Sequence, residues 1–392
     1  MLQAKSQTRL ALWAMLFGNF LVGTGVLLPS GLLNDMAKEF AISPARAGLL
    51  MFVGGLVVGI GAPLLATGTS RMDRRLLLTG SLVLYALGHL IAAIAPTFEL
   101  QLFVRAFTVI GAAIFTPQAA ATVGLIMPPE KRAATIAFIF IGWSAASVVG
   151  IPLGALLAAY VGWRLVFVVM AALCLMGAAA IWLTLKPKLY GKPLGLASWI
   201  SAFSSPVLWL VYVVTLCSMA GQFSMFSYIA PLLRDGFSAS TSGISIAFAI
   251  VGIAGIVGNS IASQVVGRFG TDNVIACGLL ALALGFAGFG IFYGVYWFAM
   301  AAAALWGLGS FSSNSLQQSR LAMLAPPIAS VTIALNTSFV YFGQSVGSAS
   351  GGAMIAAGNM PQLPWLSLAF MATALVLSLA ASSINRNKIA LA

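Results

Sequence analysis

Long apolar runs, separated by short polar ones, extend along the whole chain. Each run has roughly 20 residues or more, the length that an α-helix needs to cross a hydrocarbon core about 30 Å thick. We expect every run to be helical, because backbone groups in lipid must find hydrogen-bond partners within their own segment. The strands of a β-barrel would instead be short and alternating. The predicted spans are twelve, over residues 10–33, 47–69, 76–95, 100–126, 133–160, 165–185, 206–233, 241–266, 273–293, 295–324, 328–357 and 363–384.

The composition is that of a membrane protein. Of the 392 residues, 61% are hydrophobic and 7% are charged, against roughly 25% charged in ordinary soluble domains. The first run has no small-residue cleavage site and further spans follow it, so we expect it to remain as a helix. Cys174, Cys217 and Cys277 lie inside predicted spans without metal-ligand spacing. We interpret them as packing residues and expect neither a metal nor a cofactor.

The basic residues that give the chain its net charge of +12 are distributed according to the predicted topology. With the N-terminus in the cytoplasm, fourteen of the 19 Lys and Arg residues fall on the cytoplasmic side and one, Arg105, falls within a span. The remaining four lie outside, and they are Lys38, Arg46, Arg164 and Arg234. This excess follows the positive-inside rule. We therefore expect a monomeric, multi-pass protein of the cytoplasmic (inner) membrane, with both termini cytoplasmic and no nucleic-acid partner.

The chain divides into two similar halves. A stretch rich in Lys, Pro and Gly, Leu185–Gly195, separates six spans from six. We expect an N-terminal bundle over 1–185, a cytoplasmic linker over 186–205 and a C-terminal bundle over 206–392. An offset of 197 aligns Gly55 with Gly252, Gly61 with Gly258, Arg71 with Arg268, Gly88 with Gly285, Gly150 with Gly347, and Gly154 with Gly351. Such a repeat predicts an all-α fold of two pseudo-symmetric six-helix bundles, with a solute site near the bilayer midplane that opens alternately to each side.

A cluster of charges between the second and third spans is the first candidate site. Arg71, Asp73, Arg74 and Arg75 fall within five residues, and Arg268 is the repeat mate of Arg71. Charges at equivalent cytoplasmic positions can latch one state of a transporter by pairing with carboxylates or helix ends. We predict a gate here, with simple positive-inside anchoring as the alternative.

Four stretches resemble the major facilitator superfamily, in its twelve-span drug:proton antiporter branch near the arabinose and purine efflux permeases. They are "GAPLLATGTSRMDRR" (Gly61–Arg75), "RAFTVIGAA" (Arg105–Ala113), "GWSAASVVGIPLGALLAAYVGWRLVF" (Gly142–Phe167) and "AGQFSMFSYIAPLLRDGFS" (Ala220–Ser238). The third contains the antiporter motif of the fifth span, with Gly142, Gly150, Pro152 and Gly154. In the resembling antiporters this region lines the contact between the halves and resists leakage. Small residues also permit close helix approach, and Pro bends a helix.

Two departures from the resembling sequences bear on mechanism. The first signature normally has a Gly and an acidic residue where this chain has Ala66 and Ser70. The resembling permeases also have a membrane-embedded Glu at the position of Val26. The seven acids of this chain are all predicted at helix ends or in loops, namely Asp35, Glu39, Asp73, Glu99, Glu130, Asp235 and Asp272.

Three residues are candidates for proton coupling. An Arg near a bilayer centre costs roughly 2.5–3.5 kcal/mol on insertion scales, so Arg105 should face the interior and have a partner. It could bias a titratable group or contact solute, or it could be a structural Arg bonded to exposed carbonyls. His89, the one histidine, changes charge near physiological pH, although simple hydrogen bonding is the alternative. Asp35, at the outer end of the first span, is the best remaining carboxylate.

Polar residues on the predicted inward helices are candidates for solute binding, with aromatic residues as apolar walls. They are Asn19, Thr24, Phe115, Gln118, Gln222, Phe226, Ser227, Tyr228, Trp306, Asn314, Gln317, Asn336, Phe339, Tyr341 and Gln344. Amide and hydroxyl groups beside aromatic rings suit a neutral or weakly polar solute. Each polar residue could equally join two helices.

The sequence therefore predicts a secondary transporter and not an enzyme, since it has no nucleophile–base–acid set. The absence of an ATPase-type phosphate-binding motif excludes direct drive by ATP. We expect export of a small organic solute (a drug, sugar or nucleoside-like molecule) by proton-coupled antiport. The alternatives are a proton-independent facilitator or importer, and a membrane sensor or scaffold that has lost transport.

Overall fold

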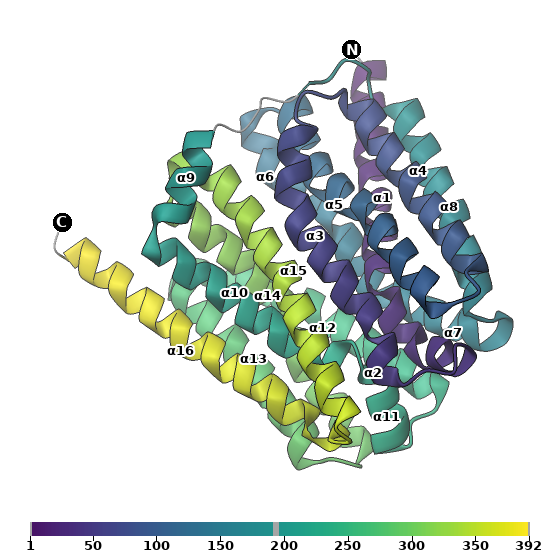
Figure 1. Cartoon of the computed structure of the whole chain (residues 1–392). Coiled ribbons are helices and arrows are strands. Elements are labelled where there is room, and N and C mark those ends of the chain that lie inside the picture. Colours follow the sequence, from purple (N-terminus) through teal and green to yellow (C-terminus); the bar gives the residue numbers. More distant parts are fainter. Residues whose placement is uncertain (1, 191–195, 391–392) are drawn as a thin grey trace. The chain divides into compact units, whose positions relative to one another are not determined.

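The structure is a computed structural model, and it describes residues 2–190 and 196–390. Over these residues it is built from helices joined by short turns, without a strand. Figure 1 shows the helices with their labels. The chain forms two compact units, and each is described here by itself.

Unit 1 consists of Met1–Ile42 and Val57–Leu194. It contains the first long helix, the second part of α3 (Leu49–Gly68) and the helices that follow as far as the linker. These are α1 (Leu2–Glu39), α4 (Arg74–Ile94), α5 (Phe98–Ile126), α6 (Pro129–Ala145), a π-helical turn (Ala146–Gly150), α7 (Ile151–Val161) and α8 (Trp163–Thr184).

Unit 2 consists of Ser43–Leu56 and Gly195–Ala392. It contains the short helix α2 (Pro44–Ala47), the first part of α3, and all helices after the linker. These are α9 (Leu196–Ser204), α10 (Pro206–Phe226), α11 (Ile229–Phe237), α12 (Thr241–Phe269), α13 (Thr271–Ile291), α14 (Tyr296–Leu324), α15 (Ala329–Ala356) and α16 (Leu363–Ala390), with 3₁₀ turns at Pro326–Ile328 and Met360–Gln362. The predicted boundaries at 185 and 206 stay a prediction.

Ten helices of the described chain are long and apolar enough to cross a membrane, where the sequence predicts twelve spans. The two that do not meet this criterion are α14 and α15, although they have 29 and 28 residues. Both have the length to span a bilayer. Their hydropathy is lowered by Ser, Thr, Asn and Gln side chains, which are concentrated in the second half of α14 and through much of α15. These two helices therefore contain much of the polar chemistry of unit 2.

A groove of small residues lets α1 approach the α6–α7 segment closely. A Cβ atom on Gly142 would collide with the backbone of Leu16, and one on Gly150 would collide with Thr24. The π-helical turn just before Pro152 has the Ile151 N–H donating to the Ala146 carbonyl. Proline lacks the N–H that a regular helical turn requires. A π-bulge is one way to accommodate the resulting change in the hydrogen-bond pattern of the helix. The predicted antiporter motif thus packs on α1 inside unit 1.

Glycines paired by the 197-residue offset make equivalent contacts inside the two units. Gly88 on α4 abuts Thr108 of α5, and Gly285 on α13 abuts Trp306 of α14. Likewise Gly150 faces α1 at Thr24, and Gly347 on α15 faces α10 at Ala220 and Ser224. Each of these positions requires a glycine, because a neighbouring helix passes where a larger side chain would lie. The predicted pseudo-symmetric helical fold is confirmed.

Candidate solute-binding site and gating residues

One face of α14 carries polar and aromatic side chains toward α10. Trp306, Ser310, Asn314 and Gln317 follow one another at intervals of four, four and three residues, which places them on one face of a helix. The Ser310 hydroxyl donates to Gln222 Oε1 of α10 at 2.8 Å, and the Trp306 ring meets Phe226 of α10 edge-on with centroids 5.9 Å apart. We call these four residues the α14 face.

The α14 face contains hydrogen-bonding atoms that are buried and have no partner in the described protein. They are Trp306 Nε1, Asn314 Oδ1 and Gln317 Oε1, with Trp306 and Gln317 only 1% and 3% exposed. Gln222 Nε2 has only long contacts, 3.4 Å to the Ser218 carbonyl and 3.9 Å to Met219 Sδ. Leaving such a group unpaired costs about 1–3 kcal/mol. This is the arrangement expected of a site that binds a polar ligand.

A second polar pair joins α10 to α15. Thr215 donates to Asn336 Oδ1 at 2.7 Å, while Asn336 Nδ2 has no partner among described residues. Beside them the rings of Tyr212 and Phe339 stack with centroids 5.2 Å apart. The predicted residues Asn336 and Phe339 therefore lie in one cluster, between two closely packed helices.

Three other predicted solute-binding residues of unit 2 use their polar side chains in hydrogen bonds to other segments of the unit. Ser227 shares a 2.5 Å hydrogen bond with Ser348, and the Tyr228 hydroxyl donates to the Ser348 carbonyl at 2.7 Å. Gln344 Nε2 donates to the Met51 carbonyl at 3.1 Å. Tyr341, also predicted, is half-buried on α15.

Among the predicted solute-binding residues of unit 1, the buried Thr24 hydroxyl has no hydrogen-bond partner among the described residues, whereas the two amide side chains have both ends bonded. Asn19 donates to the Ile139 carbonyl at 3.1 Å and accepts from Thr116 at 3.0 Å. Gln118 accepts from Arg74 and donates to Thr69 Oγ1 at 3.1 Å. Phe115 is fully buried, and its ring occupies the space where a side chain of Gly18 would be.

Arg105 binds backbone carbonyls of α1. Its Nη1 donates to the Gly25 carbonyl at 2.8 Å and its Nη2 to the Val26 carbonyl at 2.6 Å. Pro29 lies four residues after Gly25 and has no N–H, so the Gly25 carbonyl lacks its intrahelical donor. Arg105 supplies the missing donor, as in the structural alternative raised from the sequence.

His89 lies beside the same residue of α1. A side chain on Gly25 would lie 2.9 Å from His89 Nε2 and 2.5 Å from the Tyr85 hydroxyl. The other ring nitrogen, Nδ1, is 2.8 Å from the Tyr85 carbonyl. The ring packs edge-on against Tyr85 and Phe167, with centroids 4.5 and 5.6 Å away. The structure thus gathers His89 and Arg105 around Gly25, while Asp35 is half-buried further along α1.

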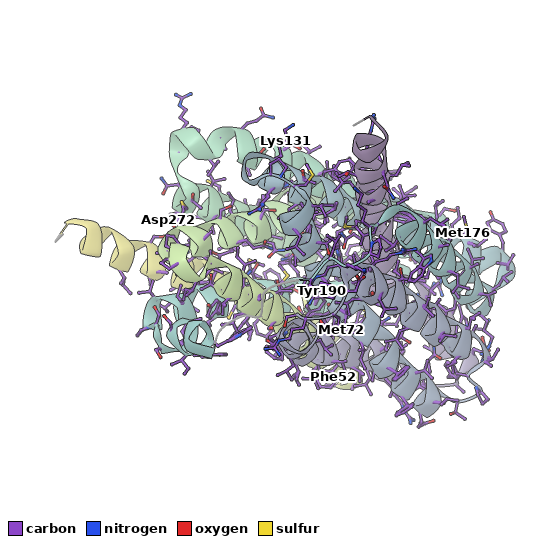
Figure 2. The ribbon with its side chains drawn as sticks, turned by 90° about the horizontal axis from the view of Figure 1, so that it is seen from above. Phe52, Met72, Lys131, Met176, Tyr190 and Asp272 are labelled. Atoms are coloured by element: carbon purple, nitrogen blue, oxygen red, sulfur yellow. The ribbon has the colours of Figure 1, made fainter. Side chains whose placement is uncertain are left out.

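Asp73, predicted in the gate, ties the linker to the α3–α4 turn. Its Oδ1 caps α4 by accepting from the backbone N–H groups of Arg75 at 2.8 Å and Leu76 at 3.2 Å. Its Oδ2 accepts from the Lys188 N–H, and the Arg74 N–H donates to the Leu189 carbonyl at 2.8 Å. Figure 2 shows Met72 and Tyr190, which adjoin these bonds, next to one another.

The arginines of the predicted gate differ in their surroundings. Arg74 is buried and donates to Gln118 and to the Ser70 carbonyl. The Arg75 guanidinium lies over the Trp182 ring at 3.9 Å. Arg71 and Arg268 are exposed, with Arg268 5.3 Å from the Phe269 ring centroid. Only the two repeat-related arginines are thus placed at the surface of their units.

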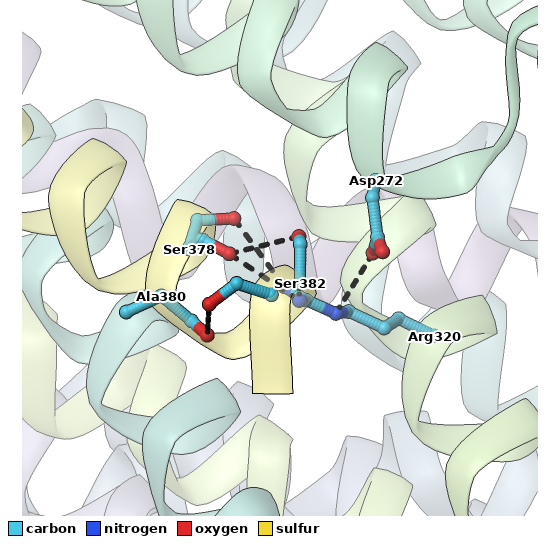
Figure 3. A network of polar contacts seen from close by, with 6 residues as sticks. Asp272, Arg320, Ser378, Ala380 and Ser382 are labelled. Carbon is cyan, nitrogen blue, oxygen red and sulfur yellow. Dashed lines mark hydrogen bonds and ion pairs between the residues drawn. The ribbon is translucent and has the colours of Figure 1, made fainter. Parts of the chain in front are cut away.

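Sequence reasoning missed a buried charge network at the end of α14. Arg320 is 3% exposed, and its Nε lies 3.1 Å from Asp272 Oδ1 at the start of α13. Its two other nitrogens contact the Ser378 hydroxyl and carbonyl and the Ser382 hydroxyl of α16 at 3.1–3.4 Å (Figure 3). An Arg at the cytoplasmic end of a predicted span, together with an acid in the first turn of the preceding helix, was the available signal.

A second network was also missed, and it joins helix ends in unit 1. Glu39 at the end of α1 accepts from Trp163 Nε1 and from Arg164 Nε at 2.6 Å. Arg164 further donates to the Ala93 and Ala95 carbonyls at 2.8 and 3.0 Å. Gly162, just before them, has φ +81°, a conformation that favours glycine. The Gly-Trp-Arg sequence thus holds together the ends of α1 and α4 and the start of α8. The sequence signal for this network was its presence in the quoted stretch Gly142–Phe167.

Long apolar helices enclosing uncharged polar groups define a multi-pass membrane protein of the solute-transporting class. In the described part of the chain, no three His, Cys, Asp or Glu side chains gather as metal ligands would. Residues 15–348 match the family model of the Major Facilitator Superfamily, and the chain belongs to this family. It is therefore a transporter and not an enzyme.

Relatives with similar sequences are bacterial transport proteins. The chain is 26% identical to the uncharacterized MFS-type transporter YbcL of Bacillus subtilis, over 92% of this chain and 93% of that protein. It is 28% identical to a probable sugar efflux transporter of Pasteurella multocida, over 85% and 82%. It is 24% identical to the inner membrane transport protein YdhP of Escherichia coli K12, over 88% and 89%.

The fold is similar to that of a solved transporter. A bacterial homologue of the human lysosomal transporter Spinster, crystallised in an inward-facing and occupied conformation, aligns with a TM-score of 0.74. The alignment covers 95% of this chain and 96% of that one at 17% sequence identity. At this identity the likeness shows the fold alone.

Proposed function

We propose that the protein exports a small, uncharged organic solute, such as a sugar, from the cytoplasm by alternating access. The observation that carries the proposal is the α14 face, where buried amide and indole groups without protein partners lie beside aromatic rings. Such a site orients a neutral solute by hydrogen bonds and holds it by apolar contact. Relatives named as sugar efflux transporters support the direction and the solute class.

For energy coupling we propose proton antiport through Asp35, His89 and Arg105. Two of these residues surround Gly25 of α1, so a change of charge at His89 would act on the helix that Arg105 holds. Protonation in this cluster would alter the packing of α1, and α1 moves with unit 1 during alternating access. We further propose that the protein is a monomer of the inner membrane with both termini cytoplasmic.

A proton-independent facilitator is the second candidate, and a specific observation favours it. The resembling permeases carry an embedded Glu where this chain has Val26, and the Val26 carbonyl is bound by Arg105. The Arg105 guanidinium, which would face such a carboxylate, therefore binds backbone carbonyls of α1 instead. Export of cationic drugs, and with it multidrug resistance, would require an acid near the midplane, and the predicted positions of the acids do not supply one.

Inverted membrane vesicles with an imposed pH gradient test the proposal. We expect radiolabelled L-arabinose or lactose to accumulate in the lumen while lumen pH rises, and both signals to fall in Asp35→Asn and His89→Gln. Sugar equilibration without proton movement would replace antiport by facilitation. Failure to move either sugar, with transport of tetraphenylphosphonium in its place, would overturn the neutral-solute proposal.

A further inference from the structure

We propose that one corner of unit 1, where α4 begins, α8 ends and the linker starts, binds the headgroup of an anionic phospholipid. Arg75, Lys186 and Lys188 bind its phosphate. Leu76 and Leu183 contact its acyl chains. We call these five residues the lipid corner. The proposal does not depend on which solute the protein transports.

The first argument is that two apolar, outward-facing stripes end at this corner. α4 and α8 pack against one another within unit 1 (Figure 1). Their exposed apolar side chains include Leu76 and Leu87 on α4, and Met176 and Leu183 on α8. Leu76 and Leu183 lie in the terminal turns of their helices and are 55% and 75% exposed. Exposed apolar surface of this kind in a membrane protein faces acyl chains.

Beside Leu76 there is also room for an acyl chain. Gly80 follows Leu76 by four residues, which places both on one face of α4. A Cβ atom on Gly80 would meet no atom within 4 Å. The outward face of α4 is therefore open just above the proposed headgroup position.

The second argument is a surplus of positive charge at the same corner. The stretches 68–80 and 180–195 contain six basic residues and one acid. The basic residues are Arg71, Arg74, Arg75, Lys186, Lys188 and Lys192, and the acid is Asp73. Lys186 and Lys188 are exposed, and neither has an ion-pair partner in the part of the chain that the structure describes. Basic residues next to the apolar part of a membrane protein attract anionic lipids.

The third argument is the placement of Arg75 at the boundary between the apolar and basic parts. Its guanidinium lies 3.9 Å from the ring centroid of Trp182, and its buried Nε has no partner among the described atoms. An arginine stacked on an aromatic face keeps the edge of its guanidinium free to bind a phosphate through two nitrogens. Trp182 is 44% exposed, and tryptophan is typical of the headgroup level of a membrane. Arg75 thus has a role other than the gate predicted from its charge.

The fourth argument is that the linker is held at the corner before a lipid arrives. The Lys188 N–H donates to Asp73 Oδ2, and the Arg74 N–H donates to the Leu189 carbonyl at 2.8 Å. The lysines on either side of Pro187 therefore stay close to the start of α4. Binding to groups that are already in place avoids part of the entropy cost of ordering them.

These features favour an anionic phospholipid over other anions and other lipids. A soluble anion would make no use of Leu76 and Leu183. A zwitterionic lipid would bring its own cation to a corner that already has a surplus of positive charge. Asp73 Oδ1 accepts from the Arg75 and Leu76 N–H groups, so side chains and not the free N–H groups of α4 bind the phosphate. Charge and apolar surface together are what anchor a protein segment to anionic lipid.

Trp182 provides the probe for a test, because a brominated acyl chain quenches the fluorescence of a nearby indole. The full-length protein is placed in phosphatidylcholine nanodiscs with increasing fractions of brominated phosphatidylglycerol. The part of the quenching that Trp182→Phe abolishes, relative to unbrominated lipid, is the signal. Brominated phosphatidylcholine serves as the matched zwitterionic lipid. We expect phosphatidylglycerol to quench Trp182 at a lower fraction than phosphatidylcholine does, with the difference reduced at high salt.

Charge variants test which residues bind the headgroup. Arg75→Gln and Lys186→Gln should each raise the lipid fraction for half-maximal quenching about fivefold, the effect of roughly one basic residue near an anionic surface, and Lys186→Arg should not. Lys131→Gln is the control, because Lys131 is an exposed basic residue of unit 1 that Figure 2 shows apart from Met72 and Tyr190. It should change that fraction less than about twofold. If Arg75→Gln fails to fold, the exposed Lys186 variants still decide the question.

Three results would overturn the proposal. Equal quenching by the two brominated lipids in the wild-type protein would show that the corner does not select anionic lipid. An equal shift in Lys131→Gln and Lys186→Gln would show a diffuse effect of surface charge. Displacement of the brominated lipid by glycerol 1-phosphate would assign the corner to a soluble anion.

Discussion

At the scale of a single residue, Arg105 completes a helix that proline interrupts. Pro29 removes the donor for the Gly25 carbonyl, and the guanidinium supplies it from α5. We expect Arg105→Met to lower the thermal stability by about 1–3 kcal/mol, because it leaves a buried carbonyl unpaired. Pro29→Ala restores the N–H and should relieve part of that loss. Melting temperatures of the two single variants and the double variant measure the coupling, and strictly additive losses would contradict it.

Arg320 presents the opposite case, a buried cation whose partner is an acid. Asp272→Asn leaves the charge of Arg320 unneutralised, and breaking a buried pair in this way costs about 3–5 kcal/mol. Since Asp272 is 22% exposed at its side chain, we expect the lower end of that range, measured by thermal unfolding in detergent. The exposed Asp235 provides the control Asp235→Asn, which should be silent. Adding Arg320→Met to Asp272→Asn should restore stability, and a further loss would show that the pair itself is not the cause.

At the scale of the element, the glycines of the α6–α7 segment, including the π-helical turn, set how closely α1 can approach. Gly150→Ala would collide with Thr24, and overpacking of this kind costs about 1–3 kcal/mol. Gly80→Ala is the matched control, because no atom lies within 4 Å of the added methyl group; it should be neutral or stabilising by up to about 1 kcal/mol. Thermal unfolding of both variants, and of Gly150→Ala with Thr24→Ala, measures the effect. Failure of Thr24→Ala to restore stability would place the cause elsewhere.

The α3–α4 turn fixes the first residues of the linker to unit 1. Asp73 uses one oxygen to cap α4 and the other to hold Lys188. Asp73→Ser keeps an N-cap side chain but its single short oxygen cannot serve both. We expect trypsin to cleave after Lys188 several-fold faster in this variant, with the free energy of unfolding lowered by less than about 1 kcal/mol. An unchanged cleavage rate would mean that the Arg74–Leu189 backbone bond suffices to hold the linker.

At the scale of the whole molecule, the sequence predicts the helices and the repeat well, because both depend on patterns along the chain. Gly150 and Gly347 were paired by spacing alone, and they contact equivalent helices in their units. The sequence does not reveal which polar side chains form hydrogen bonds with one another. Asn19 and Asn314 look alike in sequence, yet one is fully bonded and the other is not. Asp73 was predicted in a gate from its charged neighbours, whereas its bond to Lys188 and the bond from the Arg74 N–H to the Leu189 carbonyl depend on how the linker returns over the turn.

The membership of Ser43–Leu56 in unit 2 has a consequence for biogenesis. In that unit Gln344 and Ser345 of α15 donate to the Met51 and Phe52 carbonyls of α3, across 293 residues of sequence. A ribosome releases α3 long before α15, and chains generally fold as they emerge, N-terminal parts first. The early segment must therefore wait in the membrane through the insertion of most later helices before its final partners exist. The last contacts to form therefore include those between α3, one of the first helices to be made, and α15, one of the last.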